Sequence, residues 1–151
     1  MNNAGKGILD HSAIFVKLQN LVGEWRGINE EGHPAIVTYA MTANDTALVE
    51  GWKFHNDMEA LTIYHMDMDT LMAMHYCPIG NQPRLDLKGR LEDGTLMFEC
   101  VSATHLSSFD DPHEHAFTLK VNEDGSIYRE ETYVEDDGLR QSNGILFHRA
   151  V

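Results

Sequence analysis

The chain is poor in cysteine and has no long apolar run. Its two cysteines, Cys77 and Cys100, fall in different predicted strands and form neither a disulfide framework nor a Cys-x-x-Cys metal pair. No apolar stretch approaches the ~20 residues that span a bilayer. Residues 1–10 lack the basic start and apolar run of a secretory leader. We therefore expect a cytoplasmic protein with both thiols free and no membrane partner.

Positive charge is also scarce, with 11 Lys and Arg residues against 24 Asp and Glu residues and a formal net charge of −13. This charge repels phosphate backbones and anionic lipid surfaces, so we expect no nucleic-acid partner and no role at a membrane surface. The sequence lacks a phosphate-binding glycine loop, a dinucleotide fingerprint and a serine-centred nucleophile elbow. It therefore predicts no catalytic residue.

Short alternating runs dominate the chain after one helical segment. Apolar residues recur with helical spacing from Ile14 to Leu21, which predicts a short helix over about residues 11–21. The alternating runs that follow are separated by turn signals, three of which are Asp-Gly pairs. The predicted strands are Gly23–Ile28, Ala35–Thr42, Ala47–His55, Ala60–Asp67, Thr70–Cys77, Arg84–Gly89, Thr95–Ser102, His115–Val121, Ile127–Glu135 and Gln141–Arg149. Residues 1–151 are thus expected to form one all-β domain, an up-and-down antiparallel barrel of about ten strands with the helix closing one end.

Strand alternation separates the side chains that face the barrel interior from those that face outward. Glu50 has the same parity as the apolar Trp52, so this carboxyl group is expected to face inward. His113 and His115 share the parity of Phe117, so both are expected to face inward near the mouth of the barrel.

The hairpin over residues 60–77 is apolar on both faces. A two-residue turn at Met68 and Asp69 would place one set of side chains on the inward face: Thr62, Tyr64, Ala73, His75 and Cys77. The other face is expected to be covered either by the N-terminal helix or by a second copy of the chain in a homodimer.

Gly23-Glu24-Trp25 follows the helical segment and opens the first strand, and Arg149 stands close to the end of the last. This pattern resembles the calycin barrels, which include lipocalins, fatty-acid-binding proteins and nitrobindin-like haem proteins. The resemblance implies that Trp25 closes the barrel floor and that Arg149 packs over it, a cation–π contact of about 0.5–2 kcal/mol. The block from Tyr64 to Arg84 is similar to uncharacterised bacterial calycin-like proteins and implies no established activity.

Inward apolar faces interrupted by a few polar residues predict a site for a small, largely apolar ligand, with an acid group as one option for its polar end. Trp52, Tyr64 and Phe98 are expected to line this pocket. The polar end would be oriented by His75, Arg84, His113 and His115, with the planar Arg84 guanidinium suited to a carboxylate.

Glu50 is also expected to belong to this ligand site, and two residues of the site carry an open question. Glu50, once buried, must be paired or neutralised, and Arg26, Arg84 or His75 are the expected partners; a general-base role is the alternative. The alternation set by Leu85 points Arg84 outward unless the preceding loop bends it inward.

A haem- or metal-dependent enzyme is the alternative from another class. His113 and His115 form a His-x-His pair on one strand face, as a metal site requires, but the local spacing does not assemble four ligands. His148 lies late in the chain, as the haem ligand of nitrobindin-like proteins does, although the residues around it do not follow their closing pattern. Cys77 beside His75 could act as a nucleophile, but a buried inert thiol is commoner. The sequence therefore predicts no cofactor, with haem or a divalent metal at these histidines as one alternative and a homodimeric assembly module without ligand as another.

Overall fold

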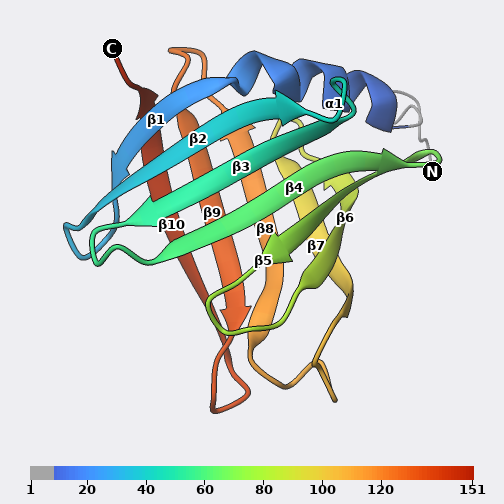
Figure 1. Cartoon of the computed structure of the whole chain (residues 1–151), viewed down its shortest axis with the longest axis vertical. Helices are drawn as coiled ribbons and strands as arrows, with labels where there is room; N and C mark the ends of the chain where they lie inside the picture. Colours follow the sequence, from blue (N-terminus) through green and yellow to red (C-terminus); the bar gives the residue numbers. More distant parts are fainter. Residues whose placement is uncertain (1–8) are drawn as a thin grey trace.

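A computed structural model describes residues 9–151 as one closed barrel (Figure 1). The elements are α1 His11–Leu18, the 3-10 helix η1 Gln19–Leu21, β1 Gly23–Ile28, β2 Pro34–Thr42, β3 Ala47–Phe54, β4 Glu59–Asp67, β5 Thr70–Tyr76, β6 Pro83–Arg90, β7 Leu96–Ala103, β8 His113–Val121, β9 Ile127–Val134 and β10 Arg140–Arg149. Consecutive strands pair antiparallel, and β1 pairs with β10 to close the ring. The predicted all-β, up-and-down barrel with a short N-terminal helix is confirmed.

Across residues 9–151, none of the helices has the length and apolar character needed to cross a membrane. The prediction that the chain lacks a leader concerned residues 1–10, and residues 1–8 of that segment lie outside the described part.

Helix α1 covers one end of the barrel (Figure 1). The Asp10 carboxylate begins the helix by accepting a hydrogen bond of 3.0 Å from the Ala13 amide. The buried side chains of Ile14, Phe15 and Leu18 join the hydrophobic core, which seals this end against water.

Trp25 lies beneath the same end. Its indole N–H donates a hydrogen bond of 2.8 Å to the Leu21 carbonyl, and the Arg149 guanidinium lies 4.4 Å from the ring centroid. Arg149 also donates to the carbonyls of Val22 and Asn20, at 2.8 and 2.9 Å. The expected contact between Trp25 and Arg149 is confirmed, and it joins the last strand to the first.

The barrel interior near the helix is solidly packed. Phe98 stacks on Phe117 with a centroid distance of 4.5 Å, and Tyr64 meets both rings edge-on. All three side chains are buried. At the helix end, a hollow of about 350 Å³ remains between α1 and the ends of β6, β7 and β8. At the opposite end, the loops at residues 29–33, 55–58, 77–82, 104–112 and 135–139 connect the strands.

The β4–β5 hairpin has the predicted register. Asp67 pairs with Thr70 across the two-residue turn, and Thr62 lies opposite His75. Helix α1 contacts both strands of the hairpin, whereas Tyr76 at the far end of the outer face is 44% exposed.

Candidate functional site

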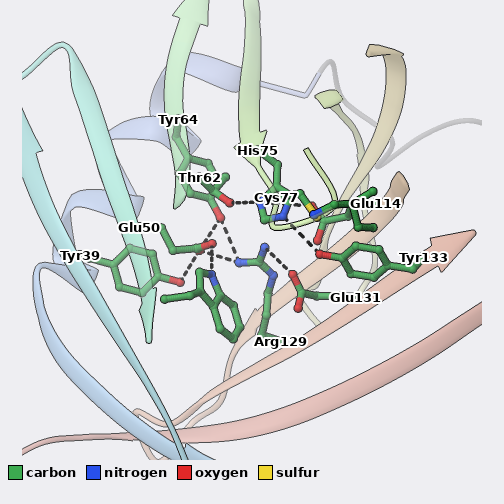
Figure 2. A network of polar contacts seen from close by, with 12 residues as sticks. Tyr39, Glu50, Thr62, Tyr64, His75, Cys77, Glu114, Arg129, Glu131 and Tyr133 are labelled. Carbon is green, nitrogen blue, oxygen red and sulfur yellow. Dashed lines mark hydrogen bonds and ion pairs between the residues drawn. The ribbon is translucent and has the colours of Figure 1, made fainter. Parts of the chain in front are cut away.

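A buried ion pair crosses the middle of the barrel (Figure 2). The Glu50 carboxylate on β3 accepts a hydrogen bond of 2.5 Å from the Arg129 guanidinium on β9. It also accepts hydrogen bonds from the Tyr39 hydroxyl at 2.7 Å, the Tyr64 hydroxyl at 2.6 Å and the Trp52 indole N–H at 2.8 Å. Four donors therefore surround one carboxylate that is fully buried.

The charges of this pair stabilise each other. Burial by itself raises the pKa of the Glu50 carboxyl, but Arg129 and the three neutral donors outweigh burial and hold that pKa below its usual value. Burial likewise opposes the charge on Arg129, but the Glu50 carboxylate reverses this effect and the guanidinium pKa is raised well above normal. Both groups are ionised at neutral pH, and their charges cancel.

A second polar cluster lies next to this pair, between the ion pair and the open end. The imidazole of His75 on β5 is held from both sides, with Nδ1 2.8 Å from the Thr62 hydroxyl and Nε2 3.2 Å from the Tyr133 hydroxyl. Burial lowers the pKa of His75, so the imidazole is neutral at neutral pH. Burial and the neighbouring carboxyls Glu114 and Glu131 raise the pKa of Tyr133, which remains a neutral phenol.

Glu114 and Glu131 form a buried carboxyl pair. The two carboxyls are close enough to affect each other's ionisation, and burial raises the pKa of both. The Glu131 pKa is raised further by the Glu114 charge, well above its usual value. Within residues 9–151, no N–H or O–H group donates to either oxygen of Glu114. A proton held between the two carboxyls satisfies this geometry, as in other carboxyl pairs that share a site.

A cavity of about 360 Å³ opens above this cluster at the end opposite α1. Its apolar wall includes Trp52, Phe54, Ala60 and Ile79. Polar groups come from two places: His75, Cys77, Glu131 and Tyr133 at the inner end, and Asn29, His55 and Asn56 in the loops at the open end. An apolar chamber with a few convergent polar groups is the arrangement typical of small-molecule sites.

The structure brings some of the predicted ligand residues to this cavity. Trp52 and His75 line it, and Glu50 lies directly behind Trp52 through the indole hydrogen bond. Tyr64 and Phe98, which were expected to line the pocket, instead belong to the packed aromatic core on the helix side. The ion-pair partner of Glu50 is also not one of the three that were expected, since it is Arg129.

Arg84 does not reach the cavity. Its guanidinium donates to Asp67 at 2.8 Å and to Asp86 at 2.9 Å, and the side chain keeps the outward direction that Leu85 implies. These carboxylates occupy the donors that a ligand acid group would have needed.

His113 and His115 do not reach the cavity either, because β8 contains a bulge between Glu114 and Ala116. An extra residue in one strand reverses the alternation beyond it. Glu114 therefore points to the interior, whereas His113 bonds to the Asp111 carbonyl at 2.7 Å and to His115 at 3.1 Å. His113 is fully buried, as an inward residue would be, but neither histidine lines the cavity.

Four residues of the site were not anticipated: Glu114, Arg129, Glu131 and Tyr133. Three of them alternate on β9 in the parity of buried Ile127, and this alternation was the available signal. Charged residues are rarely fully buried, so the Arg and Glu residues of this strand gave no sign of an interior position.

The other predicted chemistry finds little support in the geometry. His148 pairs with Arg26 on the outer face and is exposed. Burial raises the pKa of the Cys77 thiol, which disfavours the nucleophilic thiolate. Residues 9–151 contain no group of three or more His, Cys, Asp or Glu side chains placed to hold a metal ion. Comparison of the chain with protein-family models and with curated protein sequences gave no match.

Proposed function

We propose that this protein is a calycin-type barrel that binds a small, largely apolar molecule in the cavity at its open end. The observation that carries the proposal is the chamber of about 360 Å³, whose lining is largely aromatic and aliphatic and includes a few polar side chains. This volume lies within the range of small-molecule sites. Binding would remove apolar ligand surface from water at about 25 cal/mol per Å².

The polar side chains of the lining support selective binding. His75, Tyr133 and Glu131 lie at the inner end of the chamber, and Trp52, Phe54, Met58, Ala60 and Ile79 offer apolar contact around it. A ligand with one polar end is therefore held in a single orientation, because a buried polar group costs free energy unless it is hydrogen-bonded. The free thiols of Cys77 and Cys100 support a reducing compartment, the cytoplasm.

A haem- or metal-dependent enzyme receives less support. An iron ligand needs an imidazole nitrogen with a free lone pair, but both ring nitrogens of His75 are engaged, by Thr62 and by Tyr133. The remaining histidines named for this role lie outside the cavity.

The proposal is tested by filling the chamber. Ala60 lines the cavity, and Ala60→Phe places an aromatic ring in the space that the ligand would take. Binding of the uncharged fluorophore prodan to the purified chain, measured by its emission shift, should weaken by about tenfold or more in this variant.

Ala40→Phe is the matched control, since Ala40 lies on the exposed outer face of β2. It should leave prodan binding unchanged. Equal binding by the wild type and Ala60→Phe, or no binding by the wild type, would contradict the proposal. Native mass spectrometry of the freshly purified protein would also detect a co-purifying molecule.

A further inference from the structure

The barrel interior holds more acid groups than bases. Glu50, Glu114 and Glu131 contribute carboxyl groups, and Arg129 is the guanidinium among them (Figure 2). Glu50 already neutralises Arg129 through the contact of 2.5 Å, and burial keeps His75 neutral. The carboxyl pair of Glu114 and Glu131 is therefore left without a cation of its own.

Glu114 shows this shortage most directly. Its side chain is completely buried, and neither carboxyl oxygen receives a hydrogen bond from residues 9–151. The nearest basic atom is Nδ1 of His75 at 3.9 Å, which already bonds to Thr62. Two species can compensate for such a buried pair: a proton between the carboxyls, or a positive charge placed beside them.

Glu131, the second carboxyl of the pair, can be reached from the cavity. Glu131 lines the chamber and is 17% exposed, whereas Glu114 lies behind it. A group that enters the chamber can therefore contact Glu131 directly and displace the proton that Glu131 shares with Glu114.

We infer that the ligand of this cavity carries a cationic amine, whose ammonium group sits beside Glu131 and replaces the proton shared with Glu114. This inference rests on the proposed function and names the ligand class. The aromatic faces of Trp52, Phe54 and Tyr133 line the same chamber and provide further attraction for an organic cation.

A ligand carboxylate in the same place would be repelled by the negative charge of the Glu131 carboxyl. Two donors of Arg129, Nε and Nη2, find no hydrogen-bond partner among residues 9–151 and would attract an anion. However, Arg129 does not line the cavity, and its Nη2 is directed at Glu131 at 3.7 Å. An incoming carboxylate would thus meet the Glu131 carboxyl before it met the guanidinium.

Protonation of the pair makes amine binding depend on pH. Six titratable or charged groups lie around the pair: Glu50 on β3, His75 on β5, Cys77 directly after β5, Cys100 on β7, and Arg129 and Tyr133 on β9. Protons and the ammonium group compete for the same carboxyls. Affinity for an amine should therefore rise as the pH increases from about 5 to 8, a range over which an alkylamine stays charged.

Three probes of similar shape test the charge preference: 2-phenylethylamine, 2-phenylethanol and 3-phenylpropionate. Each is titrated calorimetrically into the full chain at neutral pH. The amine should bind about tenfold or more tightly than the alcohol, and the propionate should bind most weakly. Equal affinities for the amine and the alcohol, or a preference for the propionate, would overturn the inference.

Glu131→Gln removes the charge while keeping the shape of the side chain. This variant should lose the preference for the amine, and its alcohol binding should persist. Glu130→Gln is the matched control, because Glu130 is adjacent on β9 but faces outward opposite Thr118; it should retain the preference. An unchanged preference in Glu131→Gln would also overturn the inference.

Prodan binding separates this inference from the proposed function. If prodan binds the wild type and not Ala60→Phe, while the amine neither binds nor displaces prodan, the cavity binds ligands but the amine assignment is wrong. If prodan does not bind the wild type, the proposed function itself fails.

Discussion

At the scale of single residues, the centre of this barrel depends on a pair that is 79 residues apart in the chain. Glu50 and Arg129 come from strands on opposite sides of the ring, and each is buried only because the other is present. The Arg129 guanidinium also lies 3.8 Å from the Phe117 ring centroid. It therefore neutralises Glu50 and also makes a cation–π contact with Phe117.

Arg129→Met tests this dependence. The variant leaves Glu50 buried without its cation, and we expect a loss of about 3–5 kcal/mol in the free energy of unfolding, because an uncompensated buried charge is costly. Urea denaturation followed by far-ultraviolet circular dichroism measures the loss.

The double variant Glu50→Gln/Arg129→Met should recover part of that stability, since neither charge remains. If the single and double variants lose the same stability, the ion pair does not account for the effect.

At the scale of elements, two features decide what the barrel presents at each end. The bulge in β8 turns Glu114 inward and leaves His113 bonded to the 104–112 loop instead. Helix α1 seals the other end with Ile14, Phe15 and Leu18. A helix of 8 residues is not stable alone, so its cap and its packing must both contribute.

Asp10→Ala tests the cap. It removes the acceptor of the Ala13 amide, and the protein should lose about 1 kcal/mol of unfolding free energy. Asp10→Asn keeps a side-chain acceptor and should remain close to the wild type by the same denaturation experiment. An Ala variant as stable as the wild type would mean that the cap does not contribute to folding of the barrel.

At the scale of the whole molecule, the excess of acid extends from the surface into the interior. The net charge of −13 is mostly a property of exposed side chains, but the Glu114 and Glu131 pair carries the same excess into a region where charge is expensive. The folded protein therefore holds these protons more tightly than the unfolded chain does.

This linkage predicts how stability responds to pH. A carboxyl whose folded pKa is raised contributes full stability below its unfolded value, about 4.3, and loses that contribution as the pH rises through the folded value. Glu131→Gln cannot lose a proton, so its stability relative to the wild type should increase between about pH 5 and 8.

Comparing variants at each pH cancels the opposite trends of Glu50 and His75, whose lowered pKa values cost stability as the pH falls. Glu130→Gln, with the same change of net charge, should show a flat difference over this range. A flat difference for Glu131→Gln as well would show that the carboxyl pair is not protonated in the folded protein.

Most strands and turns of the barrel could be predicted from the sequence because they depend on residues that are close together in the chain. Alternation and Asp-Gly turns located the strands, and in the case of β1 both ends, Gly23 and Ile28, agree with the structure. The Met68-Asp69 turn fixed which residues of β4 and β5 share a face, so His75 was correctly expected inside. Trp25 and Arg149 were paired from their positions at the two ends of the barrel.

The sequence by itself determined the period of the strands, the turns between them and therefore the closed ring, since these depend on neighbours along the chain. Only the tertiary structure decided that Arg129 would neutralise Glu50 and that the β8 bulge would bring Glu114 beside Glu131. Those outcomes depend on the register between distant strands and on the free energy of burying charge, which no single strand specifies.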